Sequence, residues 1–199
     1  MIENSKIGVI ILAAGSSSRL GHPKQLVKFK GKPLLQLVIE LADSFDFDSR
    51  KLVLGANYEE IKANIDPGNF EIVINENWKK GMSTSIKKGL AASLKSEDLD
   101  HLLMLLSDQP LVSRENIEEL LQSQLSGKHK ATFSEYNGEV GVPAVFSREL
   151  FSEINELEGD HGAKKLISQN NFKTVKLANG NFDVDTFRDI EKLKELERE

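Results

Sequence analysis

One stretch of the chain decides the fold: Ile10-Ile11-Leu12-Ala13-Ala14-Gly15-Ser16-Ser17-Ser18-Arg19-Leu20-Gly21-His22-Pro23-Lys24-Gln25-Leu26. An apolar strand runs directly into a loop of small residues, and this loop carries Arg19 and Lys24. Small residues let backbone N–H groups approach a ligand closely, and successive N–H groups in a tight turn form a concave anion site. Two fixed positive charges suit a triphosphate better than a single phosphate. The stretch therefore predicts a nucleotide-binding loop at the end of a buried strand.

The loop follows neither of the two common nucleotide fingerprints. Lys24 lies three residues past Gly21 and is followed by Gln25, which does not fit the P-loop pattern G-x-x-x-x-G-K-(S/T). The dinucleotide pattern G-x-G-x-x-G is absent from the stretch as well. A glycine- and serine-rich turn after a strand is also often only a turn, so the loop by itself leaves a purely structural role open.

Composition places the chain among globular proteins. Its 199 residues predict a single domain that can bury about 70% of its unfolded surface. The apolar fraction of 39% and the charged fraction of 29% are ordinary for such a domain. The formal net charge of −5 argues against a nucleic-acid partner bound through a broad basic surface. A compact basic pocket for a nucleotide remains compatible with these values.

Residue counts exclude several kinds of site. The chain has no cysteine, so it has no disulfide, no thiolate metal site and no cysteine nucleophile. Its four histidines show no i, i+4 pair, which disfavours a zinc site. The short polar start predicts no signal peptide, and the apolar run over residues 9–14 is far shorter than the roughly 20 residues of a membrane helix. We therefore expect a cytoplasmic protein with no membrane partner.

Strand-like and helix-like segments alternate through the first part of the chain, which predicts right-handed βαβ units and a mostly parallel sheet. The expected strands there are residues 7–14, 51–55, 70–75 and 101–106, and the expected helices are 34–44, 58–64, 82–94 and 114–124. After this the alternation loosens, and we expect a small antiparallel excursion. The later strands are 131–136, 143–146, 173–177 and 182–184, and the later helices are 147–154, 162–169 and 187–197. The prediction is one Rossmann-like α/β domain.

Asp108 follows the apolar strand at residues 101–106, and Pro110 rigidifies the turn that presents it. In open α/β sheets, ligands bind beyond the carboxyl ends of the strands. A carboxylate there suits Mg²⁺, which one or two carboxylates hold together with phosphate oxygens and waters. The alternative is that Asp108 only caps the turn or helix that follows.

The loop and several later segments resemble the molybdenum cofactor cytidylyltransferases of the MobA-like NTP transferase superfamily. The loop is similar to L-A-A-G-x-S-x-R-(M/L)-G-x-x-K, and Asp108 begins a segment similar to D-(M/Q)-P. The other matches are G-M-x-x-S-(L/I/V)-x-x-G at residues 81–89, G-x-P-x-x-F at 141–146, G-D-x-G-(A/L)-(K/R) at 159–164 and D-(I/V)-D-T-P-x-D at 183–189. The resemblance implies a nucleotidyltransferase domain of the GT-A type over residues 1–199, with a nucleotide-binding half (6–125) and an acceptor-binding, metal-completing half (126–199).

The same resemblance implies that Asp108 and Asp185 hold the metal ion. Asp183 and Asp185 are separated by one residue on an expected strand and would point the same way, but Asp185 occupies the family's metal-binding position. The chain has Phe187 where the family usually has proline, whereas Asp189 stands in its expected place. An N-cap role for Asp185 or Thr186 remains open.

The resemblance also assigns roles to the remaining motifs. Residues 81–89 open a helix with small hydroxyl residues, where ordinary N-capping is the alternative to contact with the base and ribose. Catalytic roles fall to Arg19, Lys24, Asp108 and Asp185. Nucleotide binding falls to Leu12, Ala13, Ala14, Gly15, Ser16, Ser17, Ser18, Arg19, Lys24, Gly81, Met82, Ser83 and Ser85, and acceptor binding to Gly141, Pro143, Asp160, Gly162 and Lys164.

The activity implied is Mg²⁺-dependent transfer of CMP from CTP to molybdopterin, with release of pyrophosphate. CTP is favoured because Ala14 stands where the guanylyltransferase branch has glycine, and its Cβ would tighten the pocket around the base. Methylerythritol phosphate is an alternative acceptor, although those enzymes carry an H-D-A-A-R-P-like strand end where this chain has Ser107-Asp108-Gln109-Pro110. A sugar phosphate is a weaker alternative. A non-catalytic maturation factor for a molybdenum hydroxylase is the non-enzyme alternative, and an apoenzyme of that kind is a conceivable partner in either case.

Overall fold

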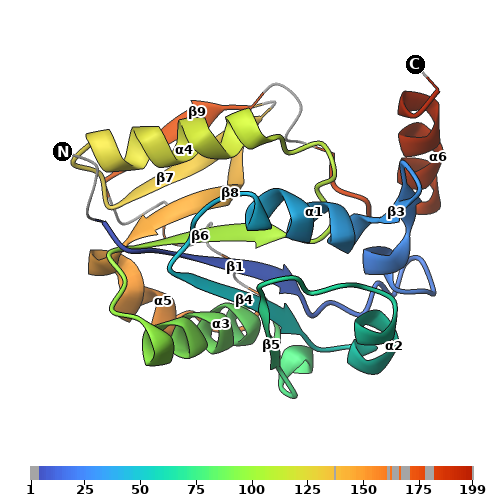
Figure 1. Ribbon diagram of the computed structural model, residues 1–199, viewed down its shortest axis with the longest axis horizontal. Helices are drawn as coiled ribbons and strands as arrows, with labels where there is room; N and C mark the ends of the chain where they lie inside the picture. Colours follow the sequence, from blue (N-terminus) through green and yellow to red (C-terminus); the bar gives the residue numbers. More distant parts are fainter. Residues whose placement is uncertain are drawn as a thin grey trace.

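A computed structural model of the chain describes residues 5–136, 138–160, 162, 166, 171–177 and 182–198. A central seven-stranded sheet has the order β5-β4-β1-β6-β8-β7-β9 (Figure 1). Parallel pairing joins β5, β4, β1 and β6, whereas β8 runs antiparallel to both of its neighbours. The strands are β1 (Ile7–Ala13), β4 (Ser49–Leu54), β5 (Glu71–Ile74), β6 (His101–Leu106), β7 (Ala131–Tyr136), β8 (Glu139–Ser147) and β9 (Phe172–Lys176).

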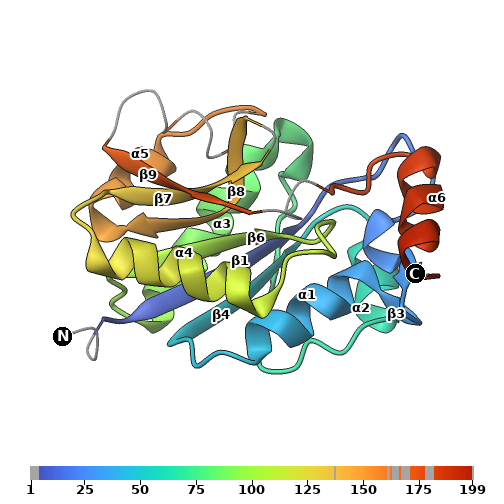
Figure 2. The same cartoon turned by 90° about the horizontal axis from the view of Figure 1, so that it is seen from above.

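Helices cover both faces of the sheet. Figures 1 and 2 show α1 (Leu34–Asp43) and α4 (Arg114–Ser126) on one face and α3 (Met82–Ser96) and α5 (Phe151–Asn155) on the other. The short α2 (Tyr58–Ala63) follows β4, and α6 (Phe187–Leu196) stands beyond the carboxyl end of β1. Smaller elements are the 3-10 turns η1 (Lys24–Leu26), η2 (Trp78–Lys80) and η3 (Arg148–Leu150) and the ribbon of β2 (Lys28–Phe29) with β3 (Lys32–Pro33).

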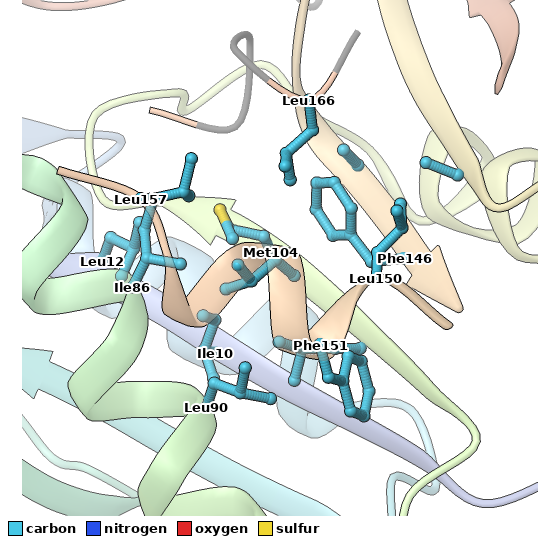
Figure 3. Close-up of a cluster of buried hydrophobic side chains, with 14 of the residues drawn as sticks. Ile10, Leu12, Ile86, Leu90, Met104, Phe146, Leu150, Phe151, Leu157 and Leu166 are labelled. Carbon is cyan, nitrogen blue, oxygen red and sulfur yellow. The ribbon is translucent and has the colours of Figure 1, made fainter. Parts of the chain in front are cut away.

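The apolar run of β1 forms a central strand because both of its faces are buried. Ile10 and Leu12 belong to the cluster under α3 and α5, which Figure 3 shows with Ile86 and Leu90 of α3. Val9 and the other residues of opposite parity belong to the cluster under α1 and α4. Each such aliphatic side chain contributes about 1.5–3 kcal/mol relative to an exposed one. The strand therefore holds a fixed register, and the loop after it starts from a rigid point.

The structure confirms the mixed α/β class and the mostly parallel sheet, including strands 101–106 and 131–136 with their predicted bounds. The predicted strand 143–146 is longer and starts at Glu139, because residues before Pro143 also pair with β7. The predicted helix 147–154 begins as η3 and becomes helical at Phe151. Most of the predicted helix 162–169 lies outside the described residues.

The predicted strand at residues 182–184 was wrong. Within the described part of the chain these residues pair with no strand, and the N–H of Val184 donates to the Asp108 carbonyl at 3.1 Å. Val184 is buried, but against Val27, Phe29 and Leu193 rather than in the sheet. No helix in the described part of the chain is long and apolar enough to cross a membrane.

Candidate active site

A cavity of about 590 Å³ opens at the carboxyl ends of β1 and β6, within the size range of small-ligand sites. The loop after β1, the end of β6 and the start of α3 form its walls. Its lining comprises Leu12, Ala13, Ala14, Gly15, Ser16, Ser18, Arg19, Lys24, Gln25, Trp78, Lys79, Gly81, Met82, Ser85, Leu106, Ser107, Asp108 and Asp160. Segments far apart in the sequence thus meet at one edge of the sheet, as the expected topology required.

The loop after β1 is held in an unusual backbone conformation. Ser17 has a φ of 54°, in the left-handed region that residues with a Cβ seldom adopt. Its carbonyl accepts bonds from the N–H groups of Leu20 and Gly21, and its Oγ accepts one from the N–H of Lys24 at 2.9 Å. These bonds stabilise Ser17 in a backbone conformation that glycine would adopt more easily.

Gln25 closes the same loop from inside. Its side chain is 1% exposed, and its Nε2 donates to the carbonyls of Ala13 at 2.8 Å and Gly15 at 3.1 Å. The carbonyls on this side are therefore satisfied. The N–H groups of residues 15–18 make no hydrogen bond within the described part of the chain, so they remain free to bind an anion.

Lys24 lies between the two predicted metal ligands. Its Nζ donates to Oδ2 of Asp108 and, at 2.6 Å, to Oδ1 of Asp185. Arg19 lies 3.6 Å from the other oxygen of Asp185, with a largely exposed guanidinium. Burial lowers the pKa of Lys24, but the two carboxylates raise it by more, so the pKa lies above the ordinary lysine value. The ammonium is charged at neutral pH.

The two carboxylates fit a magnesium ion by their chemistry. Oxygens of Asp108 and Asp185 converge on one cationic group, and two carboxylates are the usual protein contribution to a Mg²⁺ that also binds phosphate oxygens and waters. Asp108 is 7% exposed, whereas the Asp185 side chain is 45% exposed. Among the described residues, no group of three or more histidine, cysteine, aspartate or glutamate side chains is placed to hold a metal.

The start of α3 contacts the segment that carries the G-D-x-G motif. Gly81 has a φ of 106°, and a Cβ there would lie 2.3 Å from the carbonyl carbon of Gly159. The N–H of Ser83 donates to the Gly159 carbonyl at 3.1 Å. Asp160 lines the cavity directly after this contact. Gly81 is thus required for the approach of the second half of the chain to the first.

Asn75, at the end of β5, organises the first turn of α3. The side chain is buried and donates from Nδ2 to Oγ1 of Thr84 and Oγ of Ser85, both at 2.9 Å. Sequence inspection missed this residue, as well as Gln25, Trp78 and Lys79. Trp78 stands three residues before Gly81, and that proximity to a recognised motif was the available signal.

Most of the residues predicted for nucleotide binding line the cavity, but two do not. Ser17 lines an adjoining pocket of about 250 Å³, which Arg19, Lys24 and Asp185 also line. Ser83 is 1% exposed, and it lines neither space. Its assignment to nucleotide binding stays a prediction.

The predicted acceptor residues separate into two groups. Asp160 lines the cavity, and Gly162 lies where an added Cβ would be 3.0 Å from Sδ of Met82. Gly141 and Pro143 lie in β8, where Gly141 pairs with Ser134, and they are not part of the cavity lining. Their role in acceptor binding stays a prediction. Lys164 lies outside the described residues.

Comparison with known proteins agrees with this geometry. Residues 9–175 match the model of the MobA-like NTP transferase domain. The chain belongs to this family of nucleotidyltransferases. The match covers β1 from Val9 onward, the loop after it, Asp108 and the antiparallel β8, so it includes every residue that lines the cavity. Asp185 and α6 lie beyond its end.

Two proteins illustrate the relationship to other MobA-like NTP transferase domains. The chain is 31% identical over 169 residues to "Nicotine blue oxidoreductase" of Paenarthrobacter nicotinovorans, covering 80% of each sequence. Its fold matches the crystal structure of Rv0371c from Mycobacterium tuberculosis H37Rv with a TM-score of 0.85 and 27% identity, covering 96% of this chain and 99% of the other. A structure of Rv0371c in complex with manganese matches with a TM-score of 0.79 and 25% identity, over 96% and 99% of the two chains.

Proposed function

We propose that this protein transfers CMP from CTP to the phosphate of a molybdopterin-type acceptor, with Mg²⁺, and releases pyrophosphate. One observation carries the proposal: a single cavity gathers the free N–H groups of the loop after β1, the cations Arg19 and Lys24, and the carboxylate of Asp108. Asp185 borders the adjoining pocket at the same loop. This is the set of groups that transfer of a nucleotidyl group requires, namely anion binding and charge neutralisation.

The reaction needs alignment rather than a general base. The second pKa of a phosphomonoester is about 6, so the acceptor phosphate is already ionised at neutral pH and can attack the α-phosphorus. Arg19, Lys24 and the N–H groups of residues 15–18 would hold the triphosphate and stabilise the pyrophosphate as it leaves. Asp108 and Asp185 would hold Mg²⁺, which supplies charge neutralisation where the acceptor and the α-phosphate meet. The manganese complex of Rv0371c supports a divalent cation at this fold.

The preference for CTP rests on Ala14. This residue lines the cavity and is 5% exposed, and its Cβ would lie 2.9 Å from a Cβ added to Gly55. The methyl group thus packs against the backbone of Gly55, directly after β4. A pyrimidine needs less room than a purine, which favours CTP over GTP.

The test measures pyrophosphate release by the purified protein with Mg²⁺ and isolated molybdopterin cofactor, comparing CTP, GTP, ATP and UTP. We expect release with CTP that depends on the acceptor. Release with GTP instead would contradict the role of Ala14 but keep the reaction. Release with methylerythritol phosphate or a sugar phosphate in place of molybdopterin would change the acceptor alone.

Two outcomes would replace nucleotidyl transfer itself. Binding of CTP or cofactor without any pyrophosphate would favour a maturation factor that delivers cofactor to a molybdenum hydroxylase apoenzyme. A redox reaction without pyrophosphate release would favour an activity of the kind in the name of the Paenarthrobacter relative. Each outcome has its own readout, absorbance in the second case and ligand binding in the first.

A further inference from the structure

The carboxylate of Asp185 faces that of Asp108 across Lys24 although no strand holds it there. Residues 182–185 are irregular, and the side chain of Asp185 is 45% exposed. An exposed carboxylate on an irregular segment costs side-chain and backbone entropy to fix in one place. Besides the ion pairs of Asp185 with Lys24 and Arg19, contacts of the neighbouring residues hold the segment.

Gln109 supplies the contact on one side. Its side chain is 3% exposed at the end of β6, and its Nε2 donates to Oδ1 of Asp183 at 2.9 Å and to the carbonyl of Val142 in β8 at 3.0 Å. A backbone bond joins the same two segments, because the N–H of Val184 donates to the carbonyl of Asp108 at 3.1 Å. One buried amide thus ties residues 183–184 to two strands.

The other side of Asp185 is fixed by the start of α6. Thr186 and Asp189 form a reciprocal capping box, and Oδ2 of Asp189 also accepts from the N–H of Asp185 at 3.3 Å. Val184 between the two anchors is fully buried. Asp185 therefore lies between two anchored segments. The capping box of α6 is formed by neighbouring residues, whereas the contacts of residues 183 and 184 come from Asp108 and Gln109, far away in the sequence.

We propose that Gln109, in the turn after β6, is a positioning residue whose amide clamps Asp183 to β8 and thereby holds the Asp185 carboxylate opposite that of Asp108. The inference rests on the proposed function in so far as these two carboxylates hold a metal. Asp183 serves in the clamp as a hydrogen-bond acceptor and not as a third metal ligand.

The experiment measures Mn²⁺ affinity by calorimetry without nucleotide, and hydrogen exchange over residues 182–190 without metal. Gln109→Met and Asp183→Ala each remove the bond, and we expect Mn²⁺ binding about five- to tenfold weaker in both, with faster exchange. Asp183→Asn keeps an oxygen that can accept from Gln109, so it is expected to retain wild-type affinity. The double variant Gln109→Met with Asp183→Ala should be no weaker than either single variant, because both act through one bond.

Gln124→Met is the matched control. Gln124 is 2% exposed, and its amide also makes two bonds: Nε2 donates to the His129 carbonyl and Oε1 accepts from Oγ1 of Thr132. It lies near the end of α4 and makes no hydrogen bond to residues 182–190. It should lower stability without changing Mn²⁺ affinity or exchange at residues 182–190. If Gln124→Met weakens Mn²⁺ binding as much as Gln109→Met does, the effect of Gln109→Met reflects a general loss of stability, and the inference is overturned.

The remaining outcomes separate the inference from the function. Loss of Mn²⁺ affinity in Asp183→Asn would overturn the clamp, since it would make the charge of Asp183 the important property. Unchanged affinity and exchange in Gln109→Met would overturn it while leaving the metal site intact. Faster exchange in Gln109→Met together with no Mn²⁺ binding by the wild-type protein would support the clamp and reject the metal assignment of the proposed function.

Discussion

The two parts of the candidate site are positioned in different ways. The loop after β1 and Asp108 come directly from the ends of two neighbouring buried strands, whose pairing places them together. Asp185 and Asp160 come from irregular segments of the second half, which reach the site through a few side-chain and backbone contacts. The sheet fixes the position of the first part, whereas a few individual hydrogen bonds hold the second part in place. Substitutions that leave the sheet intact should therefore distinguish the two.

The largest effect is expected for the two carboxylates. Asp108→Asn and Asp185→Asn should each lower the rate of pyrophosphate release by about 10²- to 10³-fold, because each removes one negative charge that faces the reacting phosphates. Circular dichroism should show both variants folded. If Asp185→Asn keeps more than one tenth of the wild-type rate while Asp108→Asn is inactive, the Asp185 carboxylate is not needed for the reaction. The second half of the chain would then only shape the site.

Next comes the contact between the halves at Gly81. Gly81→Ala should destabilise the protein by about 3 kcal/mol, since the new Cβ would collide with the backbone of Gly159 and the backbone conformation disfavours any side chain. Gly31→Ala is the matched control, with a φ of 76° and no atom within 4 Å of the added Cβ, and it should cost about 1 kcal/mol. Urea unfolding measures both. Equal values would show that the Gly159 contact does not constrain the fold.

Lys24→Met should change two affinities in opposite directions. Removing the ammonium should weaken CTP binding about 10- to 100-fold, because a charged hydrogen bond to phosphate is lost. Binding of Mn²⁺ alone should become tighter, because Asp108 and Asp185 no longer hold a competing cation. Calorimetry with each ligand separately measures the two changes. Weakening of both would indicate that Lys24 only keeps the two carboxylates in place.

The smallest effect is expected at Ala14. Ala14→Gly should shift the preference between CTP and GTP towards GTP by about tenfold or less, the range for one carbon in a pocket. Ala13→Gly removes the same methyl group from the opposite face of β1, where Ala13 packs in the cluster under α1 and α4. Competition between the two nucleotides in one assay gives the ratio directly. An equal shift in both variants would assign the effect to the loop backbone.

The same division explains how far the sequence could lead. Continuous apolar runs predicted β1 and β6 well, because a strand buried on both faces needs no information from elsewhere. Residues 182–184 were predicted as a strand, but Val184 is buried against Val27, far away in the chain, and against Leu193 of α6. The local sequence does not distinguish a residue buried within a sheet from one buried against other segments of the chain.

Polar residues that act on the backbone were the hardest to predict. No pattern in the sequence around Gln25 or Asn75 indicates their hydrogen bonds. These bonds go to backbone carbonyls and side-chain hydroxyls that only the fold brings close. Gln109 stood inside a recognised motif, yet its partners Val142 and Asp183 are 33 and 74 positions away. Motif matching predicted the candidate site residues, whereas the contacts that hold them are visible only in the three-dimensional structure.

The ion pairs at Lys24 have a consequence for the protein before any substrate arrives. Two cationic and two anionic side chains, those of Arg19, Lys24, Asp108 and Asp185, meet at one point and balance each other. Carboxylates gathered for a metal ordinarily repel one another until the ion binds, which ties folding to metal supply. Here the chain carries its own counter-ion, so we expect it to fold without metal and to keep its melting temperature when a chelator is added.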